Sequence, residues 1–585
     1  MDDKAQSIWK RPWAGWRQIL AWFALLVGGI FVVVCVITLA ISRSALTWEF
    51  IPGALLISIV FALVGVSVFF FIRWLCHWKN LRKVLFGVAC FATLLALVVT
   101  EENWRGKHAW QKHRREWEAK GEKFTIAELM PPKVPDEKNF ALTPLLRPIL
   151  EITNGPGGTV WRDTNAMARL EKLSAELLPQ RQTNDHLVLG RLDQGTFADV
   201  AACAEFYRGN TNYPQAVTGA APADQMLTAL GKFDPEIKEL HEAAVNRTFS
   251  RFPIQYGHEP GWEILLPHLA NIKRFTTLTQ VRALAELEAG RPAEAFEDLK
   301  LGLRLSDSIR CEPLLIDHLV RIACLGINLQ TVREGLVRHA WTEAQLVELE
   351  KALGSMDLLA EYKLAMRGER ALSTGGLDYL RRGGPRAREM LGMANAGAFS
   401  LMPSGFFYQN MLTISRMQQD YNLASVDERA HLVFPEISAK EKSVLEETRW
   451  GPYTVFAKML MPALEKAVLR SAQMQTYVDA ACIGCALERY RMMNGRLPET
   501  LGPLAPQFID KIPNDVMDGK PLRYRLDSKG GYLLYSIGWN EKDDGGQLAW
   551  TKAKKERRVA VTDGDWVWLM SADPSSSEAL RRTGG

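Results

Sequence analysis

Three uncharged apolar runs open the chain and give the first expectation about its fold. They cover residues 19–41, 50–72 and 84–100. The first two exceed the roughly 18 apolar residues that mark a membrane-spanning helix, and the third, with about 17, is at the short end of that range. Because a backbone in lipid must satisfy its own hydrogen bonds, each run predicts a transmembrane helix. A cleaved signal peptide explains the first run less well, since its apolar core is too long and two more runs follow.

Basic residues around these runs predict how the anchor is oriented. Four precede the first run and four lie between the second and third, namely Lys4, Lys10, Arg11 and Arg17, and Arg73, Lys79, Arg82 and Lys83. The loop between the first and second runs holds only Arg43. This favours an inner-membrane protein with a cytoplasmic amino terminus and a large periplasmic carboxyl-terminal part. Basic residues at 105–115 oppose this orientation, but long domains are translocated largely regardless of charge.

From about residue 140 to 480 the apolar positions recur at helical spacing. Val281, Leu284 and Leu287 share one helical face, Gly290 suits a helix end, and Pro292 suits the first turn of the next helix. This predicted hairpin resembles one unit of a tetratricopeptide repeat, but a repeat array needs about three units. We therefore expect a helical-hairpin domain, with a peptide-binding repeat array as the alternative.

Breaks in the pattern divide the chain into four parts. Residues 1–100 are the expected membrane anchor, and 101–139 a helical stalk that ends in a Pro-rich linker. Residues 140–455 are the helical body, and 456–585 a long helix followed by a small antiparallel sheet. The expected fold class is therefore mainly α, with three transmembrane helices and a small α+β domain at the carboxyl end.

Composition and charge limit the classes of partner that the chain is expected to bind. The chain has 585 residues, of which 47% are hydrophobic and 23% charged, with a net charge of +5. These values are ordinary for a folded protein of several domains. No basic stripe with interleaved aromatic residues is present, so nucleic acid is not an expected partner. The expected partners are the lipid bilayer, in which the anchor lies, and a protein or peptide that binds the helical body.

The search for catalytic chemistry leaves one candidate. The chain contains no G-x-x-x-x-G-K-[ST], no H-E-x-x-H and no G-x-S-x-G at a strand-to-helix turn. Arg367, Glu369 and Arg370 lie close together among apolar residues. A carboxylate between two arginines is a catalytic candidate, although a structural ion pair is the commoner arrangement.

Two further features have a structural and a functional interpretation each. Cys482 and Cys485 form a C-x-x-C inside a continuous helical pattern, where two small core residues are expected rather than a redox site. A regulatory disulfide is the alternative in a periplasmic domain. The apolar segment 399–412 is too short to span and is expected to be a buried corner rather than a membrane contact.

The last hundred residues carry a resemblance to a known family. The segments "LERYRMMNGRLPETLGPL", "IPNDVMDGKPLRYR" and "YLLYSIGWNEKDDGG" together resemble the globular end of the major pseudopilin of type II secretion. That resemblance covers roughly residues 480–570 and implies a long helix, a small antiparallel sheet and a calcium-binding acidic loop. The chain departs from the family where Val516 replaces Pro and Asn540 replaces Asp, and its helix is not preceded by a prepilin leader.

The chain as a whole also resembles a group of membrane proteins. Its anchor, helical body and tail are similar in arrangement to uncharacterised multi-span membrane proteins of Planctomycetes and Verrucomicrobia. This resemblance implies no activity.

The acidic loop is the one predicted ligand site. Calcium takes six to eight oxygens from carboxylates, amides and backbone carbonyls. Side-chain oxygens of Asn540, Asp543 and Asp544 in the loop, and of Asp565 from the facing strand, are the expected metal ligands, with Ser536 as a residue that orients them. A solvated turn is the alternative, because Asp-Asp-Gly-Gly is also favourable turn sequence.

These observations predict a membrane-anchored, non-enzymatic scaffold or protein-binding module in the periplasm, with calcium as its one expected cofactor. The alternatives are an envelope hydrolase with its site in the helical body, and a component of a secretion or pilus-like assembly.

Overall fold

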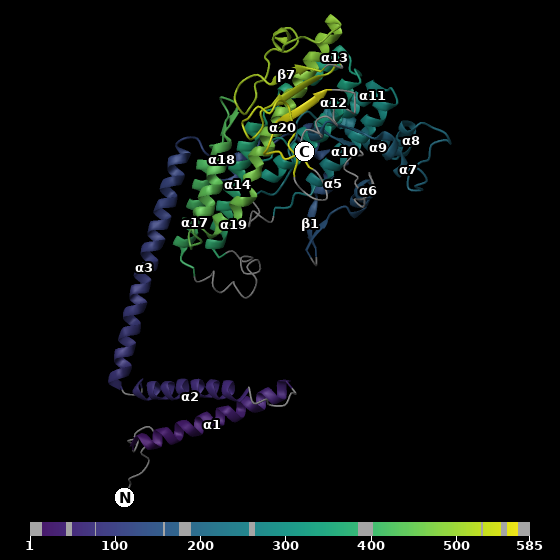
Figure 1. Cartoon of the computed structure of the whole chain (residues 1–585). Coiled ribbons are helices and arrows are strands. Elements are labelled where there is room, and N and C mark those ends of the chain that lie inside the picture. The colour runs from purple at the N-terminus through teal and green to yellow at the C-terminus, as the bar shows by residue number, and fades with distance from the viewer. Residues whose placement is uncertain are drawn as a thin grey trace. The chain divides into compact units, whose positions relative to one another are not determined.

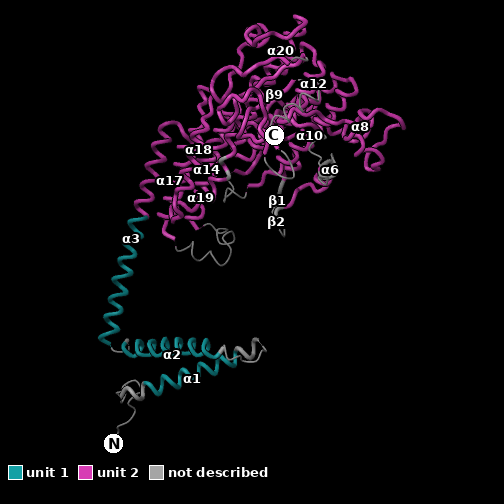
Figure 2. The backbone as a smooth tube through the Cα atoms, viewed as in Figure 1, with its two compact units in different colours: residues 1–102 teal, residues 103–585 magenta. Residues whose placement is uncertain are grey.

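The computed structural model describes residues 15–42, 50–75, 78–155, 158–174, 189–256, 264–383, 402–527, 530–551 and 558–570. Lys4, Lys10, Arg11 and Arg43, on which the orientation prediction depends, lie outside these ranges. The chain forms two compact units, Met1–Glu102 and Asn103–Gly585 (Figure 2).

Each apolar run of the first unit forms a helix. These helices are α1 (Gly15–Ser42), α2 (Phe50–Leu75) and the first part of α3 (Trp78–Glu118). All three are long and apolar enough to cross a membrane. Large apolar side chains such as Phe61 and Phe86 are exposed on them, as lipid-facing side chains would be.

A fourth helix, α12 (Leu315–Val337), also has the length and composition of a membrane-spanning helix. However, 67% of its most apolar stretch is buried inside the second unit. It carries buried charged side chains, among them Arg321 and Arg333. Charged groups are costly at the centre of a bilayer. We therefore assign α12 to the core of the second unit.

The predicted helical hairpin is confirmed. It consists of α10 (His268–Glu288) and α11 (Pro292–Asp307), with Gly290 in the left-handed region at φ 71°. The apolar faces of both helices are buried, including Leu284 and Leu299. The turn residue and the proline of the next helix therefore act as the sequence predicts.

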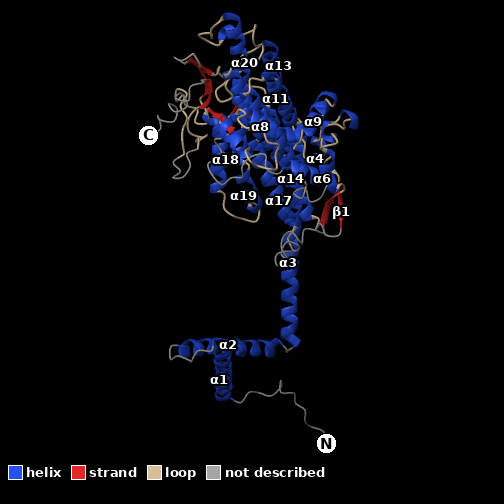
Figure 3. Cartoon of the chain, turned by 90° about the vertical axis from the view of Figure 1, so that its right-hand side faces the viewer, coloured by secondary structure: helices blue, strands red, loops and turns tan. Residues whose placement is uncertain are grey.

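The second unit is mainly helical (Figures 1 and 3). Its longer helices after α12 are α13 (Glu343–Gly354), α14 (Leu358–Arg381), α17 (Ser404–Met417), α18 (Pro435–Glu447) and α20 (Glu465–Asn494). Its other α-helices include α4 (Ile126–Leu129), α5 (Arg147–Leu150), α6 (Thr164–Ser174), α7 (Val200–Tyr207), α8 (Pro222–Leu230), α9 (Asp234–Asn246) and α19 (Val455–Leu460). Helix α20 packs against α12, α13 and α14, which places it at the centre of the unit.

The strands form small antiparallel sheets. Three are two-stranded, made of β1 (Ile152–Gly155) and β2 (Gly158–Trp161), β3 (Leu189–Arg191) and β4 (Thr196–Ala198), and β5 (Val426–Asp427) and β6 (Leu432–Val433). The fourth has the order β7 (Arg523–Leu526), β8 (Tyr532–Ser536) and β9 (Trp566–Met570). A small antiparallel sheet thus follows the long helix, as predicted.

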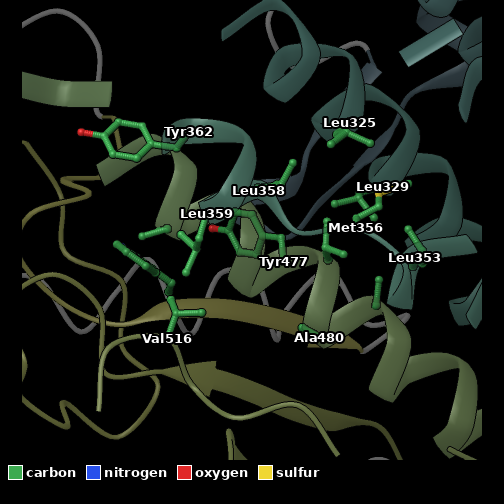
Figure 4. Packing of buried hydrophobic residues seen from close by; sticks show 14 of the residues in the cluster. Leu325, Leu329, Leu353, Met356, Leu358, Leu359, Tyr362, Tyr477, Ala480 and Val516 are labelled. Atoms are coloured by element: carbon green, nitrogen blue, oxygen red, sulfur yellow. The ribbon is translucent and has the colours of Figure 1, made fainter. Parts of the chain in front are cut away.

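The tail sheet packs directly on the helical body. Gly484 of α20 lies so close to β8 that a Cβ there would be 3.0 Å from the Tyr532 hydroxyl. The buried Arg333 of α12 donates from Nη1 to the carbonyls of Gly195, 3.2 Å away, and of Leu569 in β9, 3.3 Å away. The tail and body therefore share one core, and Val516 of the tail lies beside Leu359 and Tyr477 in it (Figure 4).

The segment expected to be a Pro-rich linker is folded into the body. It contains two short 3-10 helices, Asp136–Lys138 and Phe140–Leu142, and Phe140 is fully buried. The Phe140 amide donates to the Phe249 carbonyl at 2.8 Å. The apolar residues that follow the prolines thus fix the segment, because their burial outweighs the freedom of a linker.

Candidate functional site

The acidic loop, residues 540–546, is an ordered turn whose side chains bond its own backbone. The Asn540 Oδ1 accepts from the Lys542 amide, and the Asp543 Oδ1 from the Gly545 amide. The Asn540 Nδ2 donates to the Asp544 Oδ2 at 3.0 Å. These are the local side-chain bonds that Asn and Asp make in turns.

Asp565, the residue before β9, joins the loop, as the sequence predicts. Its carboxylate accepts from the amides of Asp544, at 3.3 Å, and Gly546, at 2.6 Å. Burial, and the charges of Asp544 and Asp543, raise the pKa of Asp565 to about 6. The four predicted ligand residues are therefore brought together, but the bonds they make hold the loop in shape.

Ser536 donates its hydrogen bond to Asp515 and not to a carboxylate of the acidic loop. Its hydroxyl donates to the Oδ1 of the buried Asp515 at 2.7 Å, and the Ile537 amide donates to Asp515 Oδ2. Arg523 Nη1 completes the set at 2.9 Å from Asp515 Oδ2. Asp515 thus fixes the turn before β7 to the end of β8. The Ser536 Oγ also accepts from the Gly538 amide at 3.1 Å, so Ser536 is bonded to Asp515 and to the backbone that leads into the acidic loop. A role for Ser536 in orienting the four predicted ligands stays a prediction.

A positive group lies beside the predicted calcium ligands. Arg523 Nε is 3.8 Å from Asp543 Oδ2, at the edge of ion-pair distance. Within the described ranges, no group of three or more His, Cys, Asp or Glu side chains is arranged to hold a metal ion. Calcium binding by Asn540, Asp543, Asp544 and Asp565 stays a prediction from the sequence, and bound calcium would replace several of the present hydrogen bonds.

The carboxylate between the two arginines of α14 is Glu122, from the segment after α3, and not Glu369. Arg370 Nη2 lies 2.7 Å and Arg367 Nε 3.2 Å from Glu122 Oε2. Their ion pairs lower the pKa of Glu122, against the effect of its burial. We call Glu122, Arg367 and Arg370 the Glu122 cluster. Helix neighbours one or two residues apart point away from each other, which is why Glu369 does not reach these arginines.

Arg370 has further structural contacts. Its side chain is fully buried, with its guanidinium carbon 4.4 Å from the centre of the Phe124 ring. It also donates to the Lys123 carbonyl at 2.9 Å and to Gln419. The Glu122 cluster therefore connects the end of the stalk to α14 and the residues after α17.

Glu369 belongs to a separate group of carboxyls at the start of α12, which the sequence did not reveal. It accepts from the Leu315 amide at 3.1 Å, and burial raises its pKa. Burial, and the nearby charges of Glu312 and Glu369, raise the pKa of Asp317 to about 8. We call Glu312, Asp317 and Glu369 the carboxyl cluster. Asp317 is therefore protonated at neutral pH.

The C-x-x-C is a pair of core residues, as expected. Cys482 and Cys485 lie inside α20, and both are buried and free. Burial raises the pKa of both thiols above the ordinary value for cysteine. A thiol with a raised pKa is a poor nucleophile, so neither has the properties of a redox cysteine.

One surface cavity lies away from all of these groups. It has a volume of about 420 Å³ and lies between α7, α8 and the loop that joins them. Its lining is Tyr207, Arg208, Pro214, Gln215, Ala216, Val217, Thr218, Gly219 and Gln225. Val217, one of these lining residues, is 81% exposed.

Comparison of the chain with family models, curated proteins and solved structures found no match. The resemblance of the tail to the pseudopilin of type II secretion, and of the whole chain to planctomycete and verrucomicrobial membrane proteins, stays a prediction from the residues quoted above.

Proposed function

We propose that this chain is a non-enzymatic, membrane-anchored scaffold or protein-binding module. Its anchor consists of α1, α2 and the first part of α3, in an inner membrane. Its second unit lies in the periplasm and binds a protein or peptide partner. The orientation follows the excess of basic residues around the first and between the second and third apolar runs.

The observation that carries this proposal is that the residues after the third apolar run are built into the second unit. Gly106, Trp110 and His113 of α3 are buried there. His113 Nε2 and Ser415 Oγ of α17 are 3.0 Å apart, and burial lowers the pKa of His113 to about 4, so the ring is neutral at neutral pH. The helix that carries the third run is therefore part of the body it holds, which suits a scaffold fixed at a membrane.

The hydrolase alternative loses its candidate site. It depended on the Arg367, Glu369 and Arg370 side chains acting on a substrate. The two arginines instead bind Glu122, and Glu369 bonds the start of α12. A catalytic acid or base must reach the proton that it transfers. Ion pairing of this kind favours a structural role for the two arginines.

The cavity between α7 and α8 supports a binding role. Arg208, Gln215 and Gln225 supply polar groups around an apolar wall that includes Pro214 and Val217. Ligand sites combine an apolar lining with a few polar groups in this way. Gln215 donates to the carbonyls of Asn210, at 2.8 Å, and Tyr213, at 3.0 Å. These hydrogen bonds fix the conformation of the loop between α7 and α8 that lines the cavity.

Site-specific crosslinking tests this proposal. A photoreactive amino acid is placed at Val217, at the cavity, and at Val245 of α9, which is almost equally exposed at 79%. In native membranes we expect a saturable crosslink from position 217 to one protein or peptide, and none from position 245. The same set of products from both positions, or none from either, would contradict a docking site at this cavity.

One observation favours a secretion or pilus-like assembly as a second candidate. Helix α20 packs on the β7–β8–β9 sheet through the close contact at Gly484. This order of a long helix and a small antiparallel sheet supports the resemblance of the tail to a pseudopilin. Mild crosslinking of native membranes followed by mass spectrometry tests it. Secretion components in stoichiometric amounts are the expected result, and their absence would remove this candidate.

A further inference from the structure

Large apolar side chains are exposed at the end of the second unit where α17 begins. Met402 precedes α17 and is 39% exposed, and Trp450 precedes α19 and is 66% exposed. Met459 and Leu460, in the last turn of α19, are 62% and 40% exposed. We call these four residues the α17–α19 patch. Contiguous exposed apolar patches mark interaction sites, so the contacts between the elements that carry these residues decide whether they act as one patch.

The elements that carry the patch are joined to each other. Asn410 of α17 donates from Nδ2 to the Pro452 carbonyl at 2.7 Å. The rings of Phe406 in α17 and Phe456 in α19 are 6.1 Å apart. Phe406 and Phe407 face the core, so the prediction of a buried corner holds for these residues of segment 399–412. Residues 399–401 lie outside the described ranges.

The same elements contact α3 immediately after its apolar run. The Gly405 amide donates to Asn103 Oδ1 at 2.6 Å, and Arg105 Nη2 donates to the Tyr453 hydroxyl at 3.5 Å. Asn103 is three residues beyond Thr100, which at the rise of an α-helix is about 4.5 Å. The polar headgroup region is about 5–8 Å thick on each side of the hydrocarbon core. Gly405 and Tyr453 therefore lie at headgroup depth if the third run spans the bilayer.

The chemistry of the patch suits that depth. Tryptophan is enriched at the membrane interface, and both Trp450 and Trp104, which follows Asn103 in α3, are about two-thirds exposed, at 66% and 67%. Lys458 Nζ lies 5.8 Å from the centre of the Trp450 ring. A lysine beside an interfacial aromatic ring buries its stem and keeps its charge among the headgroups.

Net charge does not explain the contact. Arg105, Arg449 and Lys458 are close to the patch in the sequence, but so are Glu101, Glu102, Glu446 and Glu447. The charges of the two groups nearly balance. An apolar and aromatic contact with phospholipid is therefore indicated, rather than attraction to an anionic surface.

We infer that the α17–α19 patch rests in the headgroup region of the bilayer that holds α3. The partner is phospholipid, contacted by Trp450, Met459 and Leu460. This inference rests on the proposed membrane anchor, and adds that the body itself binds the membrane surface. A second copy of the chain or another protein at the patch is the competing outcome.

Photocrosslinking to lipid tests the inference in the full chain. A diazirine amino acid is placed singly at Met459, at Met493 near the end of α20, and at Phe86 in the third apolar run. Met493 is the matched control because it is a methionine of almost equal exposure, 67%. The variants are reconstituted into nanodiscs of phosphatidylcholine, with and without added phosphatidylglycerol, and the adducts are identified by mass spectrometry.

We expect lipid adducts at positions 86 and 459, and about tenfold fewer at 493, because interfacial residues are in continuous contact with lipid. Adducts at 86 with equal, low yields at 459 and 493 would overturn the inference and leave the anchor intact. An absence of adducts at 86 would overturn the proposed anchor itself. Protein adducts at 459, or lipid adducts there only with phosphatidylglycerol, would also overturn the inference.

A second variant checks that the patch makes the contact. Trp450→Ser removes the large aromatic group, and we expect the lipid adducts at position 459 to fall while those at 86 stay unchanged. Unchanged labelling at 459 would mean that Trp450 does not hold the patch in the interface. Because Trp450 is two-thirds exposed, the substitution is not expected to unfold the unit.

Discussion

Glu122 and Arg370 form an ion pair across 248 residues of the chain, with 2.7 Å between Oε2 and Nη2. The Arg370 side chain is fully buried and that of Glu122 is 13% exposed. This pair and its partner Arg367 join the segment after α3 to α14. The contact identifies the stalk as a part of the folded body.

Removing Glu122 should therefore destabilise the second unit strongly. Glu122→Gln leaves Arg370 buried without a counter-charge, and we expect a loss of about 3–5 kcal/mol in unfolding free energy. The control is Arg291→Ala, which breaks an exposed pair with Asp224 and should cost about 0–1 kcal/mol. Thermal unfolding in detergent measures both. Equal midpoints for the two variants would mean that the Glu122 cluster has no part in stability.

The close approach of α3 and α17 makes a second prediction. A Cβ at Gly106 would lie 2.9 Å from the Gly405 carbonyl oxygen and 3.0 Å from its Cα. Gly106→Leu should therefore force the helices apart and cost about 1–3 kcal/mol or more. Gly87 lies in the same helix with no atom within 4 Å of its Cβ position, so Gly87→Leu is the control. Equal thermal unfolding midpoints for Gly106→Leu and Gly87→Leu would contradict the close contact between Gly106 and Gly405.

Asp317 should make stability depend on pH. Its folded pKa of about 8 lies above its unfolded value of 3.8, so folding favours the protonated form. The contribution of protonated Asp317 to the free energy of unfolding is complete below pH 3.8. It falls by about 1.4 kcal/mol per pH unit between 3.8 and 8, and it is lost as pH rises through 8.

The Asp317→Asn variant cannot lose that proton. Relative to it, the unmodified chain should become steadily less stable from pH 5 to pH 8, as measured by denaturant unfolding at each pH. Because other titrating groups are the same in both chains, the difference isolates Asp317. A constant difference between the two chains across this range would show that Asp317 ionises normally.

Calcium binding by the acidic loop has a direct test. If the loop binds calcium, saturating Ca²⁺ should raise the unfolding midpoint. A Ca²⁺ concentration 100 times the dissociation constant adds about 2.7 kcal/mol to the free energy of unfolding. The double variant Asp543→Asn with Asp544→Asn should lose that rise. Asp563→Asn, an exposed neighbour outside the predicted ligand set, should keep it. An unchanged midpoint for the unmodified chain would leave the loop as a turn.

The two cysteines of α20 should be unreactive in the folded protein. Burial raises the pKa of all three thiols, but Cys482 and Cys485 are inaccessible to solvent, whereas Cys311 is exposed. A water-soluble maleimide should modify Cys311 in the native chain and the other two only after unfolding, as read by peptide mass spectrometry. A native disulfide between Cys482 and Cys485, or their rapid modification, would contradict an inert pair.

Local patterns predicted local structure well. The period of Val281, Leu284 and Leu287, with Gly290 and Pro292 at the turn, is enough to place the α10–α11 hairpin. The alternation of Leu533, Tyr535 and Ile537 similarly placed strand β8, which ends at Ser536. In each case the signal lies within a short continuous segment of the chain.

Contacts between distant segments could not be predicted. The partner of Arg367 and Arg370 lies about 245 residues earlier in the chain, and nothing in its own neighbourhood marks Glu122. Asp515 was missed for a similar reason, since its importance appears only when β8 brings Ser536 to it. The carboxyl cluster also depends on how α12 and α14 pack.

The bond from Arg333 to the Leu569 carbonyl spans 236 residues and ties the last described strand to the centre of the body. Synthesis must therefore proceed more than 200 residues beyond Arg333 before this core can close. Until then α12 and α20 lack the β9 side of their packing, and apolar surface is open to aggregation. Chaperone dependence during synthesis, and poor yields of chains truncated before β9, follow from this late closure.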